Sequence, residues 1–304
     1  MSTSPASRRP SEASVAASPV PPEPVPPVPP EPSPAPYAIT PMIVESAEQI
    51  SPHFMRVVFA DPHSAIIGDD CPRDRRIKIV IPDPTTGALP ALSDGPDWYQ
   101  EWLAIPDGQR GIMRTYSVRA LEHLPHATRM TVDFVLHCVP GATGPAAAWA
   151  AQARPGQRVI IAGPRRGYAD LGGIEFLPPD HATSWIMLGD ETAAPAIART
   201  AEDLNDTRLR AYIEIPTAED ALLIDAPRPT VSWLPRGKHD RGVVLHNALD
   251  DLLASDPDAL GPQTYVWISA ESGVVRALKR RLDDRPKDML TFMGYWRRGV
   301  AMRS

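Results

Sequence analysis

The period of the hydrophobic pattern in this chain changes near residue 175. Before that point, short apolar segments rich in β-branched residues follow one another and are bounded by Pro, Gly and Asp. These segments are Ala38–Glu45, Met55–Ala60, Arg76–Ile81, Met113–Arg119, Met130–Val139 and Arg158–Gly163. Six strands in series predict a small antiparallel β-barrel.

After residue 175, apolar strands alternate with helical patterns, which predicts a parallel sheet with ligands outside the carboxyl ends of its strands. The expected strands are Ser184–Leu188, Arg208–Ile215, Val231–Leu234, Tyr265–Ser269 and Met289–Met293. The expected helices are Ala193–Leu204, Asn247–Ala254 and Gly273–Leu282. We therefore divide the chain into a tail (1–36), a barrel domain (37–175) and an α/β domain (176–304).

A proline-rich segment precedes the first expected strand, since 13 of the 37 prolines lie in residues 1–36. Proline lacks an N–H and fixes φ, so this segment favours a polyproline-like conformation and cannot build a packed core. We interpret it as a disordered tail, and a ligand for a proline-reading protein partner is the alternative. A second stretch rich in Pro, Gly and Asp, Asp83–Gln109, is expected to be a long polar loop. Its aromatic residues, Trp98, Tyr99 and Trp102, are expected to pack on the barrel or to cover a ligand.

Composition argues against several classes of protein. The 304 residues suffice for two domains with cores, and a net charge of −6 argues against a general nucleic-acid binder. The two cysteines, Cys71 and Cys138, lack a metal-ligand spacing, and no segment reads as a membrane span or signal peptide. We therefore expect a cytoplasmic protein without a metal site of its own.

The segment Arg114–Ser117 has residue types that suit a flat redox cofactor with a pyrophosphate tail. Strand alternation puts Arg114, Tyr116 and Val118 on one face and Ser117 on the other. A guanidinium can neutralise phosphate through two parallel hydrogen bonds, and a phenol ring can lie against an apolar ring system. On these residues alone, an ordinary exposed strand is the favoured interpretation.

Two turns have features of phosphate sites. Gly144 precedes an expected helix, Pro145–Gln152, whose first N–H groups can contact an anion, and a helix start without a ligand is the alternative. The turn after the first parallel strand has two carboxylates, Asp190 and Glu191, which count against a close pyrophosphate contact. Thr192 in that turn is expected either to contact a ligand or to cap the following helix.

Several motifs, taken in order, resemble the siderophore-interacting protein family, whose members are flavin-dependent ferric-siderophore reductases. The motifs are Arg114-Thr-Tyr-Ser-Val-Arg119, Gly144-Pro-Ala-Ala-Ala-Trp-Ala150, Gly163-Pro164, Leu171-Gly-Gly-Ile-Glu175, Leu188-Gly-Asp-Glu-Thr-Ala-Ala-Pro-Ala-Ile197, Ser232-Trp-Leu-Pro-Arg236 and Gly294-Tyr-Trp-Arg-Arg-Gly299. The resemblance covers residues 37–304. The Asp-Glu-Thr turn and the C-terminal Gly-Tyr-Trp-Arg are specific to the family, whereas Arg-x-Tyr-Ser belongs to the wider ferredoxin-reductase-like superfamily.

The resemblance implies a barrel that binds FAD and a Rossmann-like domain that binds NADPH or NADH. It implies FAD contacts at Arg114, Tyr116, Ser117, Val118, Asp133, His137, Gly144, Pro145, Ala146, Ala147 and Trp149. It implies NAD(P)H contacts at Gly189, Asp190, Glu191, Thr192, Pro195 and Glu271. Arg236 is a candidate for a 2′-phosphate, whereas Glu214 would suit a 2′-hydroxyl. Two departures from the family pattern stand out: Ala147 stands where many relatives have Ser, and Ser269-Ala-Glu271 stands where Ala-Gly-Glu is usual.

The implied reaction is NAD(P)H-dependent reduction of a ferric siderophore, because flavin converts a hydride donor into single-electron steps and Fe(II) is held less tightly by hard oxygen ligands. A pocket for a polar or anionic chelate needs cations and aromatic rings. The candidates are Lys78, Tyr295, Trp296, Arg297 and Arg298. A general flavin reductase and a siderophore carrier without electron transfer are the rival interpretations.

Overall fold

The computed structural model describes Met1 and residues 35–61, 73–124, 127–137, 143–166, 168 and 172–298. Predictions that concern residues 2–34, Cys71, Cys138, Leu171 and Gly299 lie outside these ranges. Within the described residues, no helix combines the length and the hydropathy needed to cross a membrane.

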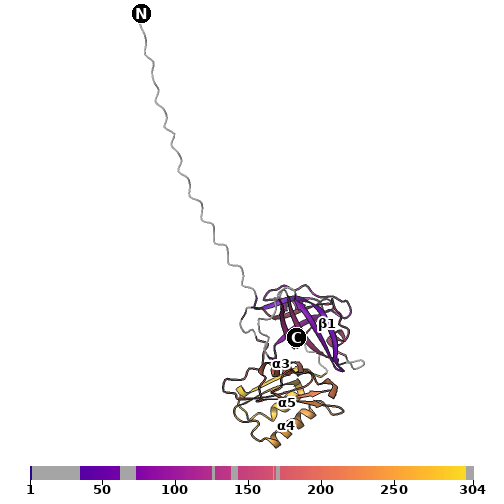
Figure 1. The fold of residues 1–304 in the computed structure, drawn as a ribbon. Coiled ribbons are helices and arrows are strands. Elements are labelled where there is room, and N and C mark those ends of the chain that lie inside the picture. Colours follow the sequence, from indigo (N-terminus) through magenta and orange to yellow (C-terminus); the bar gives the residue numbers. More distant parts are fainter. Residues whose placement is uncertain are drawn as a thin grey trace. The chain divides into compact units, whose positions relative to one another are not determined.

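The first half of the chain forms one curled antiparallel sheet, as its strand pattern predicts (Figure 1). Its strands are β1 (Tyr37–Ser51), β2 (Phe54–Asp61), β3 (Arg76–Ile81), β4 (Ile112–Ser117), β5 (Ala120–Leu124), β6 (Ala127–Val135) and β7 (Arg158–Pro164), in the order β4-β3-β7-β1-β2-β6-β5. The sheet has seven strands rather than the expected six. The additional strand is β5, whose Ala-Leu-Glu-His-Leu sequence contains no β-branched residue and so gave no strand signal.

The sheet curls until its edge strand β4 approaches β6, with which it does not pair. The rings of Tyr116 on β4 and Phe134 on β6 are 4.4 Å apart, and the Arg119 N–H donates to the Thr131 carbonyl at 2.8 Å. The short helix α2 (Pro145–Ala150) contacts both strands, and its Trp149 joins the barrel core. At this seam, between β4 and β6 and beside α2, no strand pairing of the described residues closes the barrel.

The segment expected to be a long polar loop contains a helix, α1 (Trp98–Ala104), and a 3₁₀ turn (Asp107–Gln109). Trp102 is buried on the outside of the barrel with Val80, Met113 and Ile160, and its Nε1–H donates to the Arg110 carbonyl at 2.8 Å. The expected packing of aromatic residues on the barrel is therefore confirmed. The helix was missed because Pro, Gly and Asp around it dominate the sequence pattern.

The second half forms the expected parallel sheet, in the order β10-β9-β8-β11-β12. Its strands are β8 (Ser184–Gly189), β9 (Leu209–Ile215), β10 (Thr230–Pro235), β11 (Thr264–Glu271) and β12 (Leu290–Trp296). Helix α3 (Ala194–Leu204) packs on one face, while α4 (Val243–Ser255) and α5 (Ser272–Arg280) pack on the other (Figure 1). Two 3₁₀ turns, Ala218–Asp220 and Lys287–Met289, complete the elements. The strand order reverses between β8 and β11, and ligands of open α/β sheets bind beside such a reversal.

Buried polar contacts join the two halves. Arg119, which follows β4, donates to both carboxylate oxygens of Glu202 on α3 at 2.6 Å. Asp220 accepts from the Ser51 hydroxyl at 2.8 Å and from the His53 N–H at 2.9 Å. The barrel seam is thus held against the parallel sheet by charged and hydrogen-bonded pairs. The boundary after residue 175 stays a prediction, although the Phe176 side chain packs in the same core as α3.

Candidate functional site

The Arg-x-Tyr-Ser segment lies on β4 and its side chains alternate as expected. Tyr116 and Val118 pack into the barrel core, whereas the Ser117 Oγ points the other way and lies 3.4 Å from the Tyr295 hydroxyl on β12. Burial raises the pKa of Tyr116, so its phenol stays protonated at neutral pH. The flavin motif and the C-terminal motif, 178 positions apart at these two residues, therefore meet at Ser117.

Arg114 has the properties of a phosphate-binding cation. It is half-buried on β4, and its Nη1–H donates to the Met113 carbonyl at 2.6 Å, while no carboxylate in the described ranges pairs with it. The small residues Ala146 and Ala147 in the first turn of α2, which contacts β4, are buried. A half-buried cation without a counter-charge, on a strand that contacts the small residues of α2, fits the pyrophosphate of FAD. Gly144 and Pro145 begin this helix as expected, and a Cβ at Gly144 would contact nothing within 4 Å.

Two residues implied to contact FAD have other partners in the structure. The Trp149 ring lies parallel to that of Phe59, with centroids 6.3 Å apart, inside the barrel core. Both Asp133 oxygens accept from the Arg56 guanidinium, at 2.7 and 2.8 Å, and the Asp133 side chain is fully buried. The geometry therefore gives Trp149 and Asp133 packing and ion-pair roles in the barrel.

In the acidic turn after β8, the Asp190 carboxylate accepts all its hydrogen bonds in the described residues from the protein's own donors. The Asp190 carboxylate accepts two hydrogen bonds from Thr192, from its N–H at 2.9 Å and its hydroxyl at 2.5 Å. Its other oxygen accepts from the Glu271 N–H and from the Trp296 Nε1–H, both at 2.8 Å. Thr192 therefore stabilises Asp190 rather than capping α3, whose N-cap residue is Ala193.

A buried ion cluster surrounds Glu191. Arg236, which is 8% exposed, donates to Glu191 at 3.1 Å and to Glu214 at 2.9 Å, and Arg241 pairs with the other Glu191 oxygen. The Gly242 N–H also donates to Glu214, at 2.8 Å. Arg236 is therefore an internal counter-ion, and its charge is already neutralised where the sequence suggested a 2′-phosphate site. Glu214, the candidate for a 2′-hydroxyl, likewise already accepts hydrogen bonds from the protein, from Arg236 and from the Gly242 N–H.

The pKa values of Asp190 and Glu191 are shifted in opposite directions by burial and by neighbouring charges. Burial and the neighbouring Glu191 raise the pKa of Asp190 to about 6. Burial alone would raise the pKa of Glu191 too, but Arg241 and Arg236 outweigh it and hold that pKa below its usual value. His137, which was expected to contact FAD, lies 3.9 Å from Glu191, and burial lowers its pKa despite that carboxylate.

Trp296 is held between the two halves of the molecule. Its ring centroid lies 5.8 Å from that of His137, which follows β6, and 5.0 Å from the Arg241 guanidinium. Sequence reasoning missed Arg241, because nothing in the charged loop Lys238–Arg241 distinguishes it from a solvated turn.

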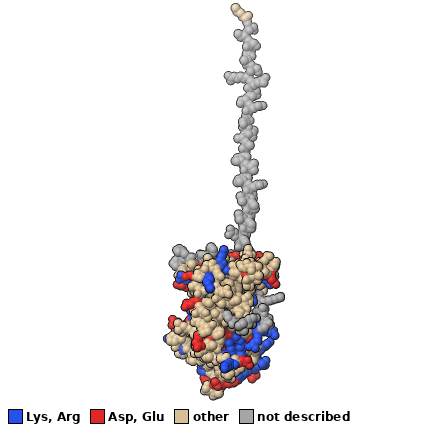
Figure 2. Space-filling model, turned by 90° about the vertical axis from the view of Figure 1, so that its right-hand side faces the viewer, with Lys and Arg blue, Asp and Glu red and all other residues tan. Residues whose placement is uncertain are grey.

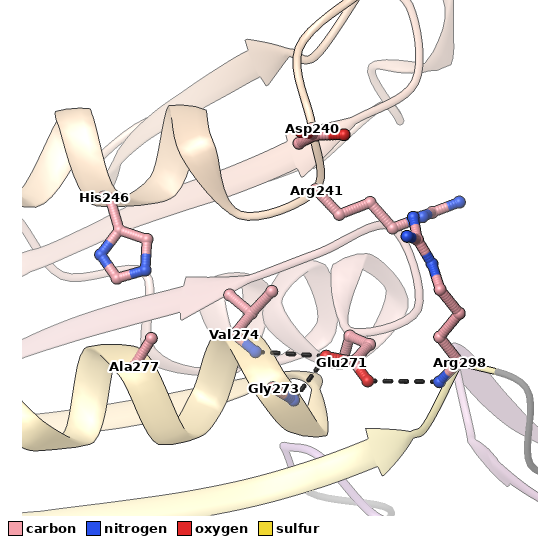
Figure 3. Close-up of a pocket in the computed structure, with 8 residues that line it drawn as sticks. All are labelled: Asp240, Arg241, His246, Glu271, Gly273, Val274, Ala277 and Arg298. Carbon is pink, nitrogen blue, oxygen red and sulfur yellow. Dashed lines mark hydrogen bonds between the residues drawn. The ribbon is translucent and has the colours of Figure 1, made fainter.

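A pocket of about 400 Å³ opens beside this cluster, between the N-terminal ends of α4 and α5 (Figure 3). It is lined by Asp240, Arg241, His246, Glu271, Gly273, Val274, Ala277 and Arg298. The side chains of Arg241 and Arg298 extend toward one another at one end, and His246 lies at the other (Figure 3). Of the residues expected to bind NAD(P)H, only Glu271 lines this pocket, and its carboxylate caps α5 by accepting from Gly273 and Val274.

The cations expected to bind a chelate lie in two places. Lys78 is on the outer face of β3, with its Nζ 3.3 Å from the Thr115 hydroxyl, and burial and then Arg76 lower its pKa. Arg297 and Arg298 are exposed at the end of β12. Lysine and arginine side chains also gather on one face of the parallel-sheet half (Figure 2).

Gly189, at the end of β8, is required by close packing. A Cβ built there would lie 2.7 Å from the Ala193 Cβ, 2.7 Å from the Ile197 Cδ1 and 3.0 Å from the Ser269 carbonyl oxygen. We expect Gly189→Ala to lower the free energy of unfolding by about 1–3 kcal/mol, because α3 must move away from β11. Chemical denaturation would measure this, with Gly144→Ala as the matched control, since a Cβ there meets open space. Equal stability of the two variants would contradict the expected clash.

Comparisons with known proteins agree with this architecture. Residues 43–168 match the siderophore-interacting FAD-binding domain, and residues 182–299 match the siderophore-interacting protein model. An uncharacterised protein of Mycobacterium tuberculosis is 32% identical over 271 residues, which cover 84% of this chain and 89% of the relative. The NADPH-dependent ferric-chelate reductase of Escherichia coli is 26% identical over 263 residues, covering 84% and 91% of the two chains.

Solved structures show the same fold. The siderophore utilization protein from T. fusca is 27% identical, with a TM-score of 0.68 over 90% of this chain and 97% of the other. The ferredoxin-NADP⁺ reductase of Plasmodium falciparum is 11% identical, with a TM-score of 0.57 over 83% and 95%, and shows the likeness of fold alone. The architecture is thus ferredoxin-reductase-like, and the chain belongs to the siderophore-interacting protein family.

Proposed function

We propose that this protein reduces ferric siderophores with electrons that pass from NAD(P)H through bound FAD, and that it releases Fe(II) in the cytoplasm. Relatives support the reaction class: besides the E. coli ferric-chelate reductase, the ferric vibriobactin reductase of Vibrio cholerae is 26% identical over 232 residues, which cover 73% of this chain and 76% of the relative. The observation that carries the proposal is the approach of Tyr295 to Ser117, because it brings the C-terminal motif to the flavin motif.

FAD, when bound, supplies the conversion of hydride transfer into single-electron transfer to Fe(III). The chain supplies position and charge. Arg114 would hold the pyrophosphate, together with backbone N–H groups at Ala146 and Ala147, since no hydroxyl stands at position 147. Tyr116, at the seam beside α2, would lie against the flavin ring, and the Ser117 hydroxyl would reach its polar edge.

The pocket between α4 and α5 suits the adenosine end of the nicotinamide dinucleotide. It lies beside the strand-order reversal, and its volume falls within the range of small-molecule sites. Val274 and Ala277 provide an apolar wall, while Arg298 has no carboxylate partner for its side chain among the described residues. Because Arg236 is already paired, Arg298 is the better candidate for a 2′-phosphate, and we propose NADPH as the preferred donor.

The chelate would meet Arg297 and Lys78, which belong to or adjoin the two segments that approach each other at Ser117. Arg297 is exposed beside Tyr295 and Trp296, and the lowered pKa of Lys78 reflects a half-buried ammonium that would gain from an anionic partner. Lys78 adjoins Thr115, two residues before Ser117 on β4. We expect Lys78→Ala to slow reduction of ferric siderophore while reduction of a small dye by the same flavin continues.

Arg114→Ala is expected to weaken FAD binding about 10- to 100-fold, because a charge-assisted hydrogen bond contributes about 1.5–3 kcal/mol. The dissociation constant can be measured by titrating apoprotein with FAD and following flavin fluorescence. Arg158→Ala is the matched control, since Arg158 is exposed at the start of β7 in the same barrel. Equal FAD affinity in the two variants would contradict the role of Arg114.

The reaction itself is tested with purified protein under anaerobic conditions. We expect a flavin absorbance spectrum, its loss when NADPH is added, and its return when a ferric siderophore follows. A flavin that NADPH reduces but that does not respond preferentially to iron chelates would identify a general flavin reductase. A colourless protein that binds the chelate but takes up no FAD would identify a carrier.

A further inference from the structure

The two sequence motifs that are specific to the family touch each other. The Trp296 Nε1–H, from the C-terminal motif, donates to the Asp190 Oδ2, from the acidic turn, at 2.8 Å, although the residues are 106 positions apart. The same oxygen accepts from the Glu271 N–H at 2.8 Å. One carboxylate oxygen thus holds two segments, the end of β11 and the end of β12.

The segments that Asp190 holds lead directly to both parts of the proposed site. Tyr295, one residue before Trp296, lies against Ser117 in the flavin motif. Arg298, two residues after Trp296, lines the pocket, and its N–H donates to the Glu271 carboxylate at 3.2 Å (Figure 3).

Further contacts fix the Trp296 residue itself. The Ser272 hydroxyl donates to the Trp296 carbonyl at 2.8 Å. The ring lies near Arg241 on one side and His137 on another. Trp296 is therefore held at its backbone, at its indole N–H and at its ring, and the indole N–H is the contact that depends on Asp190.

We infer that Asp190 is a positioning residue: through Trp296 and Glu271 it sets the end of β12, and thereby the place of Arg298 in the nucleotide pocket and of Tyr295 at the flavin. This inference rests on the proposed function. It explains why an acidic turn stands beside a nucleotide site, where a carboxylate would repel phosphate. All four hydrogen bonds at Asp190 come from the protein's own donors, and its charge is directed at the C-terminal segment rather than at a ligand.

The test uses the FAD-loaded protein and three variants, Asp190→Asn, Trp296→Phe and the double variant. In Asp190→Asn, one carboxylate oxygen becomes an NH₂ group, which cannot accept from the pair of donors that faces it. In Trp296→Phe, the aromatic ring is retained but the indole N–H is lost. We expect each single change to raise the KM for NADPH about tenfold, with a smaller effect on kcat and with unchanged FAD content. Because both changes remove or weaken the same Asp190–Trp296 contact, their effects are expected to be less than multiplicative in the double variant. Trp98→Phe on α1 is the matched control and is expected to leave all parameters unchanged.

A structural readout tests the Asp190–Trp296 hydrogen bond, here called the clamp, separately from the kinetic constants. The indole N–H resonance of Trp296, identified by its loss in Trp296→Phe, is expected to shift and to exchange faster in Asp190→Asn. An unshifted resonance would overturn the clamp whatever the kinetics. A shifted resonance with unchanged KM and kcat, or multiplicative effects in the double variant, would overturn the positioning role. A wild-type flavin that NADPH does not reduce would overturn the proposed function, and the role of the clamp in it, even where the resonance behaves as expected.

Discussion

Replacing Arg236 with methionine is expected to lower the free energy of unfolding by about 3–5 kcal/mol, because removing one partner leaves buried charges without compensation. The Glu191 and Glu214 side chains are fully buried, and Arg236 lies between them at 3.1 and 2.9 Å. Methionine fills much of the same volume but has no charge, so the two carboxylates would face each other. Arg241 and, at 3.9 Å, His137 would remain near Glu191, and the Gly242 N–H would remain at Glu214.

Urea denaturation followed by circular dichroism would measure this change. Arg210→Met is the matched control. Arg210 lies on β9, next to β10, and pairs with Asp256 at 2.8 Å, but its side chain is 40% exposed. Exposed pairs contribute about 0–1 kcal/mol, so the control is expected to remain close to the wild type. A loss in Arg236→Met no larger than in Arg210→Met would contradict the buried ion cluster.

The second large effect is a pH dependence of stability that originates at Asp190. Its pKa is about 6 in the folded protein, against an ordinary value of 3.8, so the folded state retains this proton after the unfolded chain has lost it. Raising the pH from about 4 to about 7 is therefore expected to cost the wild type up to about 3 kcal/mol relative to Asp190→Asn, at 1.36 kcal/mol per pKa unit. The contribution is fully present below the ordinary pKa and is lost as the pH rises through 6.

Comparing the two proteins isolates this one group. The neighbouring groups Glu191, Arg236 and His137 are present in both proteins, so their contributions largely cancel in the difference. Denaturation curves collected between pH 4 and 8 would give the difference in unfolding free energy at each pH. Parallel profiles for the wild type and the variant would show that Asp190 titrates near its ordinary pKa. The expected slope would mean that the protein retains an ionised carboxylate at a cost in stability, as functional sites often do.

Most of the fold follows from local patterns in the sequence. The change from strands in series to strands alternating with helices identifies both sheets, because each period reflects which faces are buried. The patterns fail where neighbours rather than local sequence decide the structure. Ala120–Leu124 becomes strand β5 by pairing with β6, and Trp98–Ala104 becomes a helix by burying Trp102 on the barrel.

Sequence reasoning named several residues of the network around Asp190 but not their contacts. Asp190, Glu191, Arg236 and Trp296 were all expected at the site, and the structure brings them into one network. Glu191 and Arg236 are 45 positions apart and Asp190 and Trp296 are 106 positions apart, and no local period relates such distant positions. Arg236 was therefore expected to meet a ligand phosphate, whereas its partners are the protein's own carboxylates.

The most direct test of the electron pathway is to reduce the purified, FAD-loaded protein anaerobically with NADPH, remove excess nucleotide, and mix it with a ferric siderophore and a ferrous trap in a stopped-flow spectrometer. We expect flavin absorbance to return at the same rate at which the ferrous trap develops colour, with both processes slowed together in Lys78→Ala. Reoxidation of the flavin without Fe(II), or a flavin that stays reduced in the presence of the chelate, would contradict the proposal that electrons pass from this flavin to siderophore-bound iron.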